Sequence, residues 1–404
     1  MNILYLMNFA GKGGSEKYIA DLAERLIEEK HNVHFIYNIG GMLGIEFEKL
    51  GVTPVQIKMS NPFDFGAVRK MLRYCRINDI DIIHAQHQRE HYIALLVKLF
   101  RPKTKVVFTC HFAAENNALW KLMNSIMTRR DDAAIAVCDI VRRYMIANGF
   151  PRKKVQVIYN GVKCDEAEEI VGDESIDPNE IAAEFGIMTN FNFVFVTLTR
   201  FSEEKGNLFL LESIKLLREK TRLPFKVIFV GDGDLLEDCK AFAEENELFD
   251  NVCFTGYRTD TDEILKLAKV YINSSSKEAL SFAIIEALAK GLPAIVTNVG
   301  GNIEIVNRDT NCGLVVNYGD IEAMAEAMHD MMFDHELYDY LRENALEVVR
   351  TMFNSEFSIA ETFYVYESLI DGNEVKSKKK KKSKNKDSDL FPIPNESESE
   401  ATDE

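Results

Sequence analysis

Short apolar runs alternate with amphipathic stretches along most of the chain, and this alternation predicts its elements. Near the N-terminus, apolar runs at 3–7, 33–37, 81–84 and 105–109 predict strands, and the apolar positions of 15–29 recur with helical spacing. Strands that alternate with helices form right-handed βαβ units around a buried parallel sheet. The first part of the chain is therefore predicted to be an α/β domain.

The same alternation begins again near residue 193. The predicted strands cover 193–198, 225–230, 252–255, 270–273 and 294–297, and the predicted helices cover 208–219, 235–245 and 282–290. This pattern predicts a second doubly wound domain, similar in size to the first.

Composition divides the chain into five predicted segments. A polar, acidic stretch separates the two alternating regions, and a last amphipathic stretch precedes a tail with eight Lys between Lys376 and Lys386, followed by seven acidic residues. Such a tail cannot bury enough apolar area to offset its ordering entropy, so we predict that it is disordered. The segments are an N-terminal domain at 1–165, a linker at 166–192, a C-terminal domain at 193–355, a crossover helix at 356–372 and the tail at 373–404.

Length, charge and cysteine usage narrow the class of protein. A chain of 404 residues, 46% hydrophobic, is long enough for two domains and excludes a single small binding module. The net charge of −16 argues against a nucleic-acid partner, because phosphate backbones attract a positive face. The seven scattered Cys lack metal-ligand spacing, and no apolar run reaches about 18 residues. We expect a cytoplasmic protein with free thiols, without a signal peptide or a membrane span.

Charge is distributed unevenly. Residues 66–154 contain 17 Lys or Arg and 7 Asp or Glu, a net charge of +10, so the remainder carries −26. The basic residues recur on amphipathic stretches with large apolar neighbours, at 68–76 and 119–130. Such stretches suit an anionic membrane surface, which predicts peripheral docking at the inner face of the cell membrane with a lipid-linked acceptor. The alternative is a solvated basic face that offsets the acidic second domain.

Two loops that follow predicted strands carry candidate phosphate ligands, because ligands of open α/β sheets bind at the carboxyl ends of strands. Gly11–Glu16 is glycine-rich and runs into a helix, whose N-terminal N–H groups can bind an anion. Arg200 and Lys205 can converge on one diphosphate, the first as a planar fork and the second as a point charge. Each loop also has an alternative interpretation without a ligand: the first could be a tight turn from strand to helix, and the second a solvated charged turn.

The stretch from Ser274 to Pro293 is the most informative. Glu278 lies in a loop before the predicted helix, and Glu286 lies in the second turn of that helix, within an otherwise apolar run. A carboxylate in such a run is costly unless something donates hydrogen bonds to it, and sugar hydroxyls could do so.

These residues resemble the retaining family 4 glycosyltransferases of the GT-B fold, whose signature is two Glu separated by seven residues. The resemblance extends over about residues 1–370. Further matches, in the family's order, are Gly13-Gly14-Ser15-Glu16, His111 after a strand, Asn160-Gly161-Val162, Arg200 with Lys205, Gly231-Asp232-Gly233, Asn251–Gly256, and Gly300-Gly301 with Glu304.

The resemblance implies a role for each matching residue. A nucleotide-sugar donor would lie on the second domain, with Arg200 and Lys205 on its diphosphate, Glu286 on the ribose and Glu278 on the sugar hydroxyls. Further expected contacts are backbone N–H groups at Leu280, Ser281 and Phe282 with the phosphates, Gly14 as the point where the first domain approaches them, His111 near the transferred sugar or acceptor, and backbone groups near Tyr257 and Arg258 with the base.

The implied fold is α/β of the GT-B type, with two doubly wound Rossmann-like domains facing a central cleft, a C-terminal crossover helix and the disordered tail. The implied reaction is retaining, metal-independent transfer of a hexose or N-acetylhexosamine from a nucleotide diphosphate sugar, most often a UDP-sugar, without a further cofactor. The acceptor would be a saccharide, a lipid-linked group or a protein, in surface polysaccharide, glycolipid or glycoconjugate assembly. The alternatives are a non-catalytic partner subunit, a nucleotide-sugar epimerase and a phosphorylase.

Some residues depart from the pattern or allow other interpretations. Ala279 follows Glu278 where Gly is commoner in the family, and Phe112 follows His111 where Asp is frequent. His84 and His87 also resemble the family's pattern, but they could equally well be polar residues at the edge of a sheet. The pairs Asp79/Asp81 and Asp232/Asp234 look like a metal-binding DxD motif, but the first enters a strand and the second fills a glycine turn, so we predict no metal site.

Overall fold

The computed structural model describes residues 1–11, 13–112, 115–163, 182–185 and 193–372. The predicted linker at 166–192 lies outside the described residues except for 182–185, and the predicted tail at 373–404 lies wholly outside them. Residues 182–184 are helical.

The N-terminal domain is built on a seven-stranded, wholly parallel sheet of order β3-β2-β1-β4-β5-β6-β7. Its strands are β1 Asn2–Phe9, β2 Asn32–Ile39, β3 Val55–Gln56, β4 Ile82–Ala85, β5 Lys105–Cys110, β6 Ala133–Ala136 and β7 Val155–Val157. Its helices are α1 Gly14–Glu28, α2 Met42–Lys49, α3 Phe65–Ile77, α4 Gln88–Phe100, α5 Ala118–Met127, η1 Thr128–Arg130 and α6 Asp139–Ala147.

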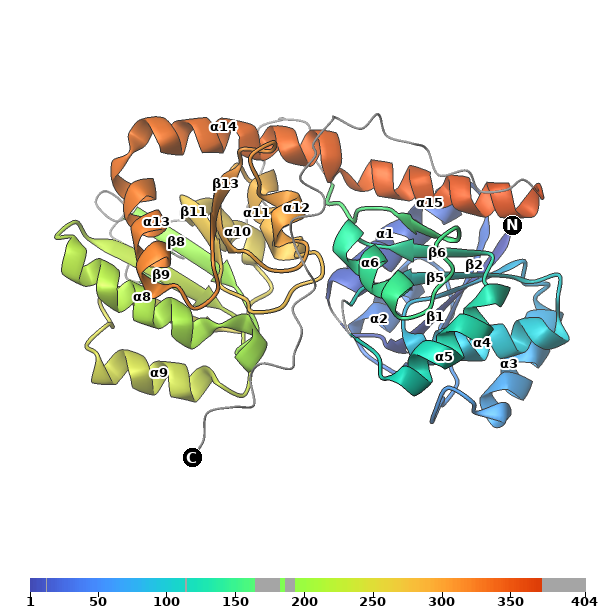
Figure 1. Ribbon diagram of the computed structural model, residues 1–404. Coiled ribbons are helices and arrows are strands. Elements are labelled where there is room, and N and C mark those ends of the chain that lie inside the picture. The colour runs from blue at the N-terminus through green and yellow to red at the C-terminus, as the bar shows by residue number, and fades with distance from the viewer. Residues whose placement is uncertain (12, 113–114, 164–181, 186–192, 373–404) are drawn as a thin grey trace.

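The C-terminal domain contains a six-stranded parallel sheet of order β10-β9-β8-β11-β12-β13. Its strands are β8 Phe193–Leu198, β9 Phe225–Val230, β10 Val252–Gly256, β11 Val270–Asn273, β12 Ala294–Thr297 and β13 Gly313–Val316. Its helices are η2 Glu203–Lys205, α8 Asn207–Lys220, α9 Leu236–Glu245, α10 Thr261–Leu267, α11 Phe282–Ala289, α12 Asn302–Ile305, α13 Ile321–Phe333 and α14 His335–Met352. The expected pair of doubly wound domains is confirmed, and Figure 1 shows them side by side.

Alternation along β1 explains how helices cover both faces of the first sheet. Leu4 and Leu6 point into one apolar cluster, whereas Ile3, Tyr5 and Met7 point into another. Because side chains of a strand alternate between faces, a strand buried on both sides is a continuous apolar run, as β1 is in the sequence.

The last two helices connect the domains. In Figure 1, α14 runs along the C-terminal domain and α15 (Ser355–Ile370) continues along the N-terminal domain, where it contacts α1. The junction between them is pinned to the N-terminal domain by a parallel bridge between Val162 and Asn354. Asn354 also caps α15, because its side chain accepts a hydrogen bond from Glu356 N. Among the described residues, no helix is both long and apolar enough to cross a membrane.

Candidate active site

The predicted donor residues lie where strands of the C-terminal sheet end. Arg200 follows β8, Glu278 follows β11 and Gly300 follows β12, all on the loops at the carboxyl edge of the sheet. The neighbouring order β8-β11-β12 brings these loops together. This is the edge at which open α/β sheets bind their ligands.

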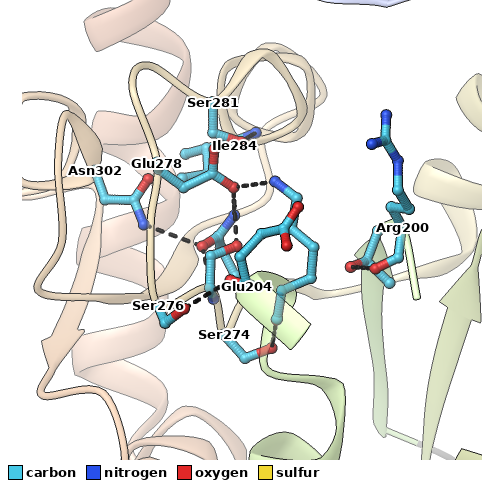
Figure 2. Close-up of polar contacts among 12 residues, drawn as sticks. Arg200, Glu204, Ser274, Ser276, Glu278, Ser281, Ile284 and Asn302 are labelled. Carbon is cyan, nitrogen blue, oxygen red and sulfur yellow. Dashed lines mark hydrogen bonds and ion pairs between the residues drawn. The ribbon is translucent and has the colours of Figure 1, made fainter. Parts of the chain in front are cut away.

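Glu278 is the centre of a hydrogen-bond cluster that Figure 2 shows in detail. Its Oε1 accepts from Lys205 Nζ at 2.6 Å, from Ser275 Oγ at 2.8 Å and from Asn273 Nδ2 at 3.4 Å. The Glu278 side chain is 11% exposed and that of Lys205 is 27% exposed. The structure therefore joins two of the predicted site residues as an ordered ion pair.

Buried contacts behind this cluster fix its backbone. Asn302, fully buried in α12, donates to Asn273 Oδ1 at 3.0 Å. Gly300 has φ +50°, and a Cβ built on it would lie 1.7 Å from Glu278 O. Only glycine fits at this close approach, so the loop after β12 holds the Glu278 backbone in place.

Arg200 is not brought into the cluster. Its side chain is exposed, and its guanidinium forms no hydrogen bond or ion pair with the described residues. Figure 2 draws it beside the cluster with no contact to it. The expected convergence of Arg200 and Lys205 on one diphosphate stays a prediction.

Glu286 meets the N-terminal domain. Its Oε1 accepts from Lys17 Nζ at 2.7 Å, and both side chains are partly exposed. The apolar run predicts a costly acid at Glu286, whereas the structure gives this side chain a cation partner from α1. Lys17 was missed because a contact between domains leaves no local pattern, although it lies one turn after the glycine-rich loop.

The start of α11 lies against that loop. A Cβ on Gly14 would be 2.2 Å from Phe282 Cδ2, so glycine permits this close contact between the two domains. The expected approach of Gly14 to the donor phosphates stays a prediction. Ser281 caps α11 by accepting from Ile284 N, and Leu280 is buried just before it. The helix begins where the predicted phosphate contacts require it to begin.

The predicted base contacts occupy the loop after β10. Tyr257 is 62% exposed. Arg258 is held by carboxylates, at 2.7 Å from Asp260 Oδ2 and 2.9 Å from Glu184 Oε1. This pairing with Asp260 raises the pKa of Arg258. The loop is ordered by these ion pairs, and recognition of the base by its backbone stays a prediction.

His111 lines a pocket of the N-terminal domain. The pocket has a volume of about 120 Å³ and is lined by polar groups from Gln86, His87, Asn116 and Asn148 above an apolar floor. His111 Nε2 lies 2.9 Å from Gln86 Oε1, and burial lowers the pKa of His111 to about 3. The imidazole is therefore neutral near pH 7, so one ring nitrogen can donate a hydrogen bond and the other can accept one, for example from a hydroxyl group.

His84 and His87 differ in environment. His84 is fully buried beneath α15, with Nδ1 2.6 Å from Tyr366 Oη and Nε2 2.7 Å from Thr109 Oγ1, so it is a packing residue. His87 lines the His111 pocket, and its buried Nδ1 has no hydrogen-bond partner among the described residues.

Glu304 joins the two domains, a role that its place in the sequence motif did not reveal. Its carboxylate accepts from the backbone N of Asp139 and Ile140, both at 2.8 Å, and from Tyr159 Oη at 2.8 Å. A carboxylate on the first N–H groups of α6 is favoured by the helix dipole.

One aspartate of each predicted pair accepts a hydrogen bond from the backbone. Asp81 accepts from Asn2 N at 2.8 Å, and Asp232 accepts from Gly233 N at 2.8 Å. Over the described part of the chain, no group of three or more His, Cys, Asp or Glu is placed to hold a metal ion.

Family profiles match both halves of the chain. Residues 12–166 match the profile described as Glycosyltransferase Family 4, and residues 180–348 match that of Glycosyl transferases group 1. The chain belongs to the family 4 glycosyltransferases. It is 24% identical over 383 residues to N-acetyl-alpha-D-glucosaminyl L-malate synthase of Bacillus anthracis, covering 90% of this chain and 96% of that one.

Other known proteins match part of the chain or its fold. UDP-Gal:alpha-D-GlcNAc-diphosphoundecaprenol alpha-1,3-galactosyltransferase of Escherichia coli is 28% identical over 203 residues, which cover 50% of this chain and 51% of that one. Among solved structures, a Rickettsia africae glycosyltransferase has a TM-score of 0.80 at 20% identity, covering 91% of this chain and 98% of that one. Anabaena Alr3699/HepE in complex with UDP has a TM-score of 0.78 at 18% identity, covering 91% and 100%. The GT-B fold expected from the sequence is confirmed.

Proposed function

We propose that this glycosyltransferase moves a hexose or N-acetylhexosamine from a UDP-sugar to an acceptor hydroxyl, with retention of the anomeric configuration and without a metal ion. The observation that carries the proposal is the 2.6 Å pair between Lys205 and Glu278 at the carboxyl edge of the C-terminal sheet. It offers a cation to the diphosphate and a carboxylate to the sugar hydroxyls. The choice of uridine is motivated by the UDP complex of the Anabaena protein.

In this reaction the bond between sugar C1 and the diphosphate oxygen breaks, and a bond from C1 to the acceptor oxygen forms on the same face. Positive charge grows on the sugar and negative charge on the leaving diphosphate. Lys205, Arg200 and the N–H groups at the start of α11 stabilise that negative charge. The acceptor proton passes to the leaving phosphate oxygen, so the products are the glycoside and UDP.

The two glutamates have separate proposed roles. Glu278 accepts hydrogen bonds from the sugar, and Glu286 accepts them from the ribose, in exchange for part of its contact with Lys17. The neutral His111 faces the transferred sugar or acceptor. The named acceptors of the relatives, malate and a lipid-linked sugar, motivate an acceptor in polysaccharide or glycoconjugate assembly.

The test follows radiolabelled UDP-sugars into acceptors of a bacterial lipid and saccharide extract, with and without EDTA. We expect a labelled product with the donor's anomeric configuration by NMR, formed equally with EDTA. Glu278→Gln should lower turnover more than UDP affinity, and Glu286→Gln should lower UDP affinity. Release of free altered nucleotide-sugar, or no turnover with intact UDP binding, would instead support an epimerase or a non-catalytic subunit.

A further inference from the structure

We propose that α5 and the basic turns beside its C-terminal end dock the N-terminal domain onto an anionic lipid bilayer. The docking itself stands on the surface described below. Its meaning for catalysis, that a lipid-linked acceptor enters from the docked face, rests on the proposed function.

An apolar stripe of α5 faces solvent. Leu119, Leu122 and Ile126 are 66%, 58% and 50% exposed, and their spacing of three and four residues places them on one side of the helix. The opposite side is tied to the domain through Asn124, the one buried residue of α5, which accepts from Tyr92 Oη at 2.7 Å. The helix thus directs its leucines outward while a polar side chain anchors it.

Cations gather at the C-terminal end of this stripe. Arg129 and Arg130 are exposed directly after α5, and Arg152 and Lys153 are exposed in the turn before β7. The two turns are adjacent, because Lys154 Nζ donates to Arg129 O at 2.7 Å. We call these four exposed residues the basic cluster.

The nearest carboxylates do not neutralise the basic cluster. Asp131 is buried and bonded to His91 Nε2 at 2.6 Å. Asp132 is largely covered and paired with Lys98. On the other end of α5, Glu115 pairs with Lys121 at 3.8 Å.

An anionic bilayer fits both features at once. Exposed leucine side chains can enter the boundary between headgroups and acyl chains, while arginines beside them meet the lipid phosphates. A purely ionic partner would leave the apolar stripe uncovered, and an apolar partner would leave the basic cluster unpaired. The net charge of +10 over residues 66–154, in a chain of −16, directs this face rather than another toward an anionic surface.

The docked face includes the edge of the His111 pocket. Phe112, 64% exposed, lines that pocket, as does Asn116, directly before the residue that caps α5. An acceptor carried by a lipid would therefore reach the pocket without leaving the bilayer surface.

Cosedimentation of the full chain with vesicles tests the proposal. With about 30 mol% phosphatidylglycerol in phosphatidylcholine, at about 0.15 M salt, we expect binding that is at least about tenfold stronger than to phosphatidylcholine alone. Combining Leu119→Ser, Leu122→Ser and Ile126→Ser should weaken binding by about tenfold or more. Arg129→Glu with Arg130→Glu should weaken it by at least about fivefold for each residue. The matched control, Leu223→Ser with Phe249→Ser on the C-terminal domain, replaces side chains of 51% and 54% exposure and should change nothing.

Three results would overturn the proposal. The first is equal binding to both kinds of vesicle. The second is unchanged binding of the α5 variants, which would assign vesicle binding to the Lys-rich stretch 376–386. The third is self-association through α5 without vesicle binding. A thermal shift with UDP, recorded for each variant, confirms folding and tests the donor site separately. Vesicle binding without any UDP shift would contradict the proposed function and leave the docking surface standing.

Discussion

Lys205 and Glu278 orient each other at the site, since a charge-assisted bond of 2.6 Å favours one rotamer of each side chain. We predict that Lys205→Ala lowers kcat by about 10² or more, because the leaving diphosphate loses a cation that its growing charge requires. Initial rates at saturating donor measure this effect. The control is Lys240→Ala, which removes an exposed Lys paired with Glu237 at 2.8 Å and should leave kcat unchanged. Equal rates for both variants would contradict the role of Lys205.

Gly300 and Gly319 separate the effect of backbone strain from that of a close contact. Both have positive φ, +50° and +83°, but a Cβ on Gly300 would strike Glu278 O, whereas nothing lies within 4 Å of one on Gly319. Either substitution by Ala should cost about 1 kcal/mol of stability through the left-handed backbone. Gly300→Ala should cost about 2 kcal/mol more and also slow transfer, because the Glu278 backbone must move. Urea unfolding measures the loss of stability, and initial rates measure the effect on transfer. Identical behaviour of the two variants would show that the close contact between residue 300 and Glu278 O is unimportant.

At the scale of elements, α15 closes over a buried histidine of the N-terminal sheet. Burial lowers the pKa of His84 to about 3. Because the unfolded His titrates near 6.5, the stability that neutral His84 contributes is complete above that pH and declines as pH falls from 6.5 toward 3. We predict that His84 alone makes the protein about 2 kcal/mol less stable at pH 5 than at pH 7. Urea unfolding at both pH values should show this loss in wild type and a smaller one in His84→Gln; parallel losses would contradict it.

The hydrogen bond between Tyr366 and His84 should contribute to the docking of α15. Tyr366→Phe removes this bond of 2.6 Å and leaves His84 Nδ1 buried without it. We expect a loss of about 1 to 3 kcal/mol in unfolding free energy. Tyr340→Phe, an exposed position on α14, is the matched control and should be close to neutral.

Sequence patterns predicted the elements that are continuous apolar runs. The strands 193–198 and 225–230 were predicted with the limits that the structure has, because both are buried parallel strands. The strand Ala133–Ala136 was missed, because three of its four residues are alanines that favour no strand. The two-residue strand Val55–Gln56 is too short to form a pattern.

In the candidate site too, the residues with a local sequence pattern were predicted and their partners from distant parts of the chain were not. The apolar run around Glu286 and the resemblance to the family's pair of Glu pointed to Glu278 and Glu286. The loop after β8 pointed to Lys205. Their partners Lys17 and Asn302 were not predicted, because each comes from a distant part of the chain and only the folded sheets bring it to the site. Contacts of this kind depend on topology and side-chain placement rather than on local periodicity.

At the scale of the whole molecule, the proposed transfer requires that the two domains are held face to face. Glu304 accepts three hydrogen bonds from the N-terminal domain, two of them from backbone N–H groups. Glu304→Ala should lower the transfer rate by about tenfold, because losing these charge-assisted bonds costs about 1.5 to 3 kcal/mol for domain apposition. UDP affinity should change little, since the proposed phosphate and sugar contacts lie on the C-terminal domain. Initial rates measure the transfer, and titration calorimetry measures the affinity for UDP. The control is Glu237→Ala, which removes a side chain that is 82% exposed. An unchanged rate would contradict a role of Glu304 in apposition.

Nucleotide binding by the C-terminal domain is the central claim, and a thermal-shift panel of UDP, GDP and ADP without added metal tests it most directly. A nucleotide at about 100 times its Kd stabilises the folded state by about 2.7 kcal/mol. We predict that UDP raises Tm by about 3 °C or more in wild type and by less in Glu286→Gln, while ADP has little effect. A Tm that no nucleotide changes would contradict the account.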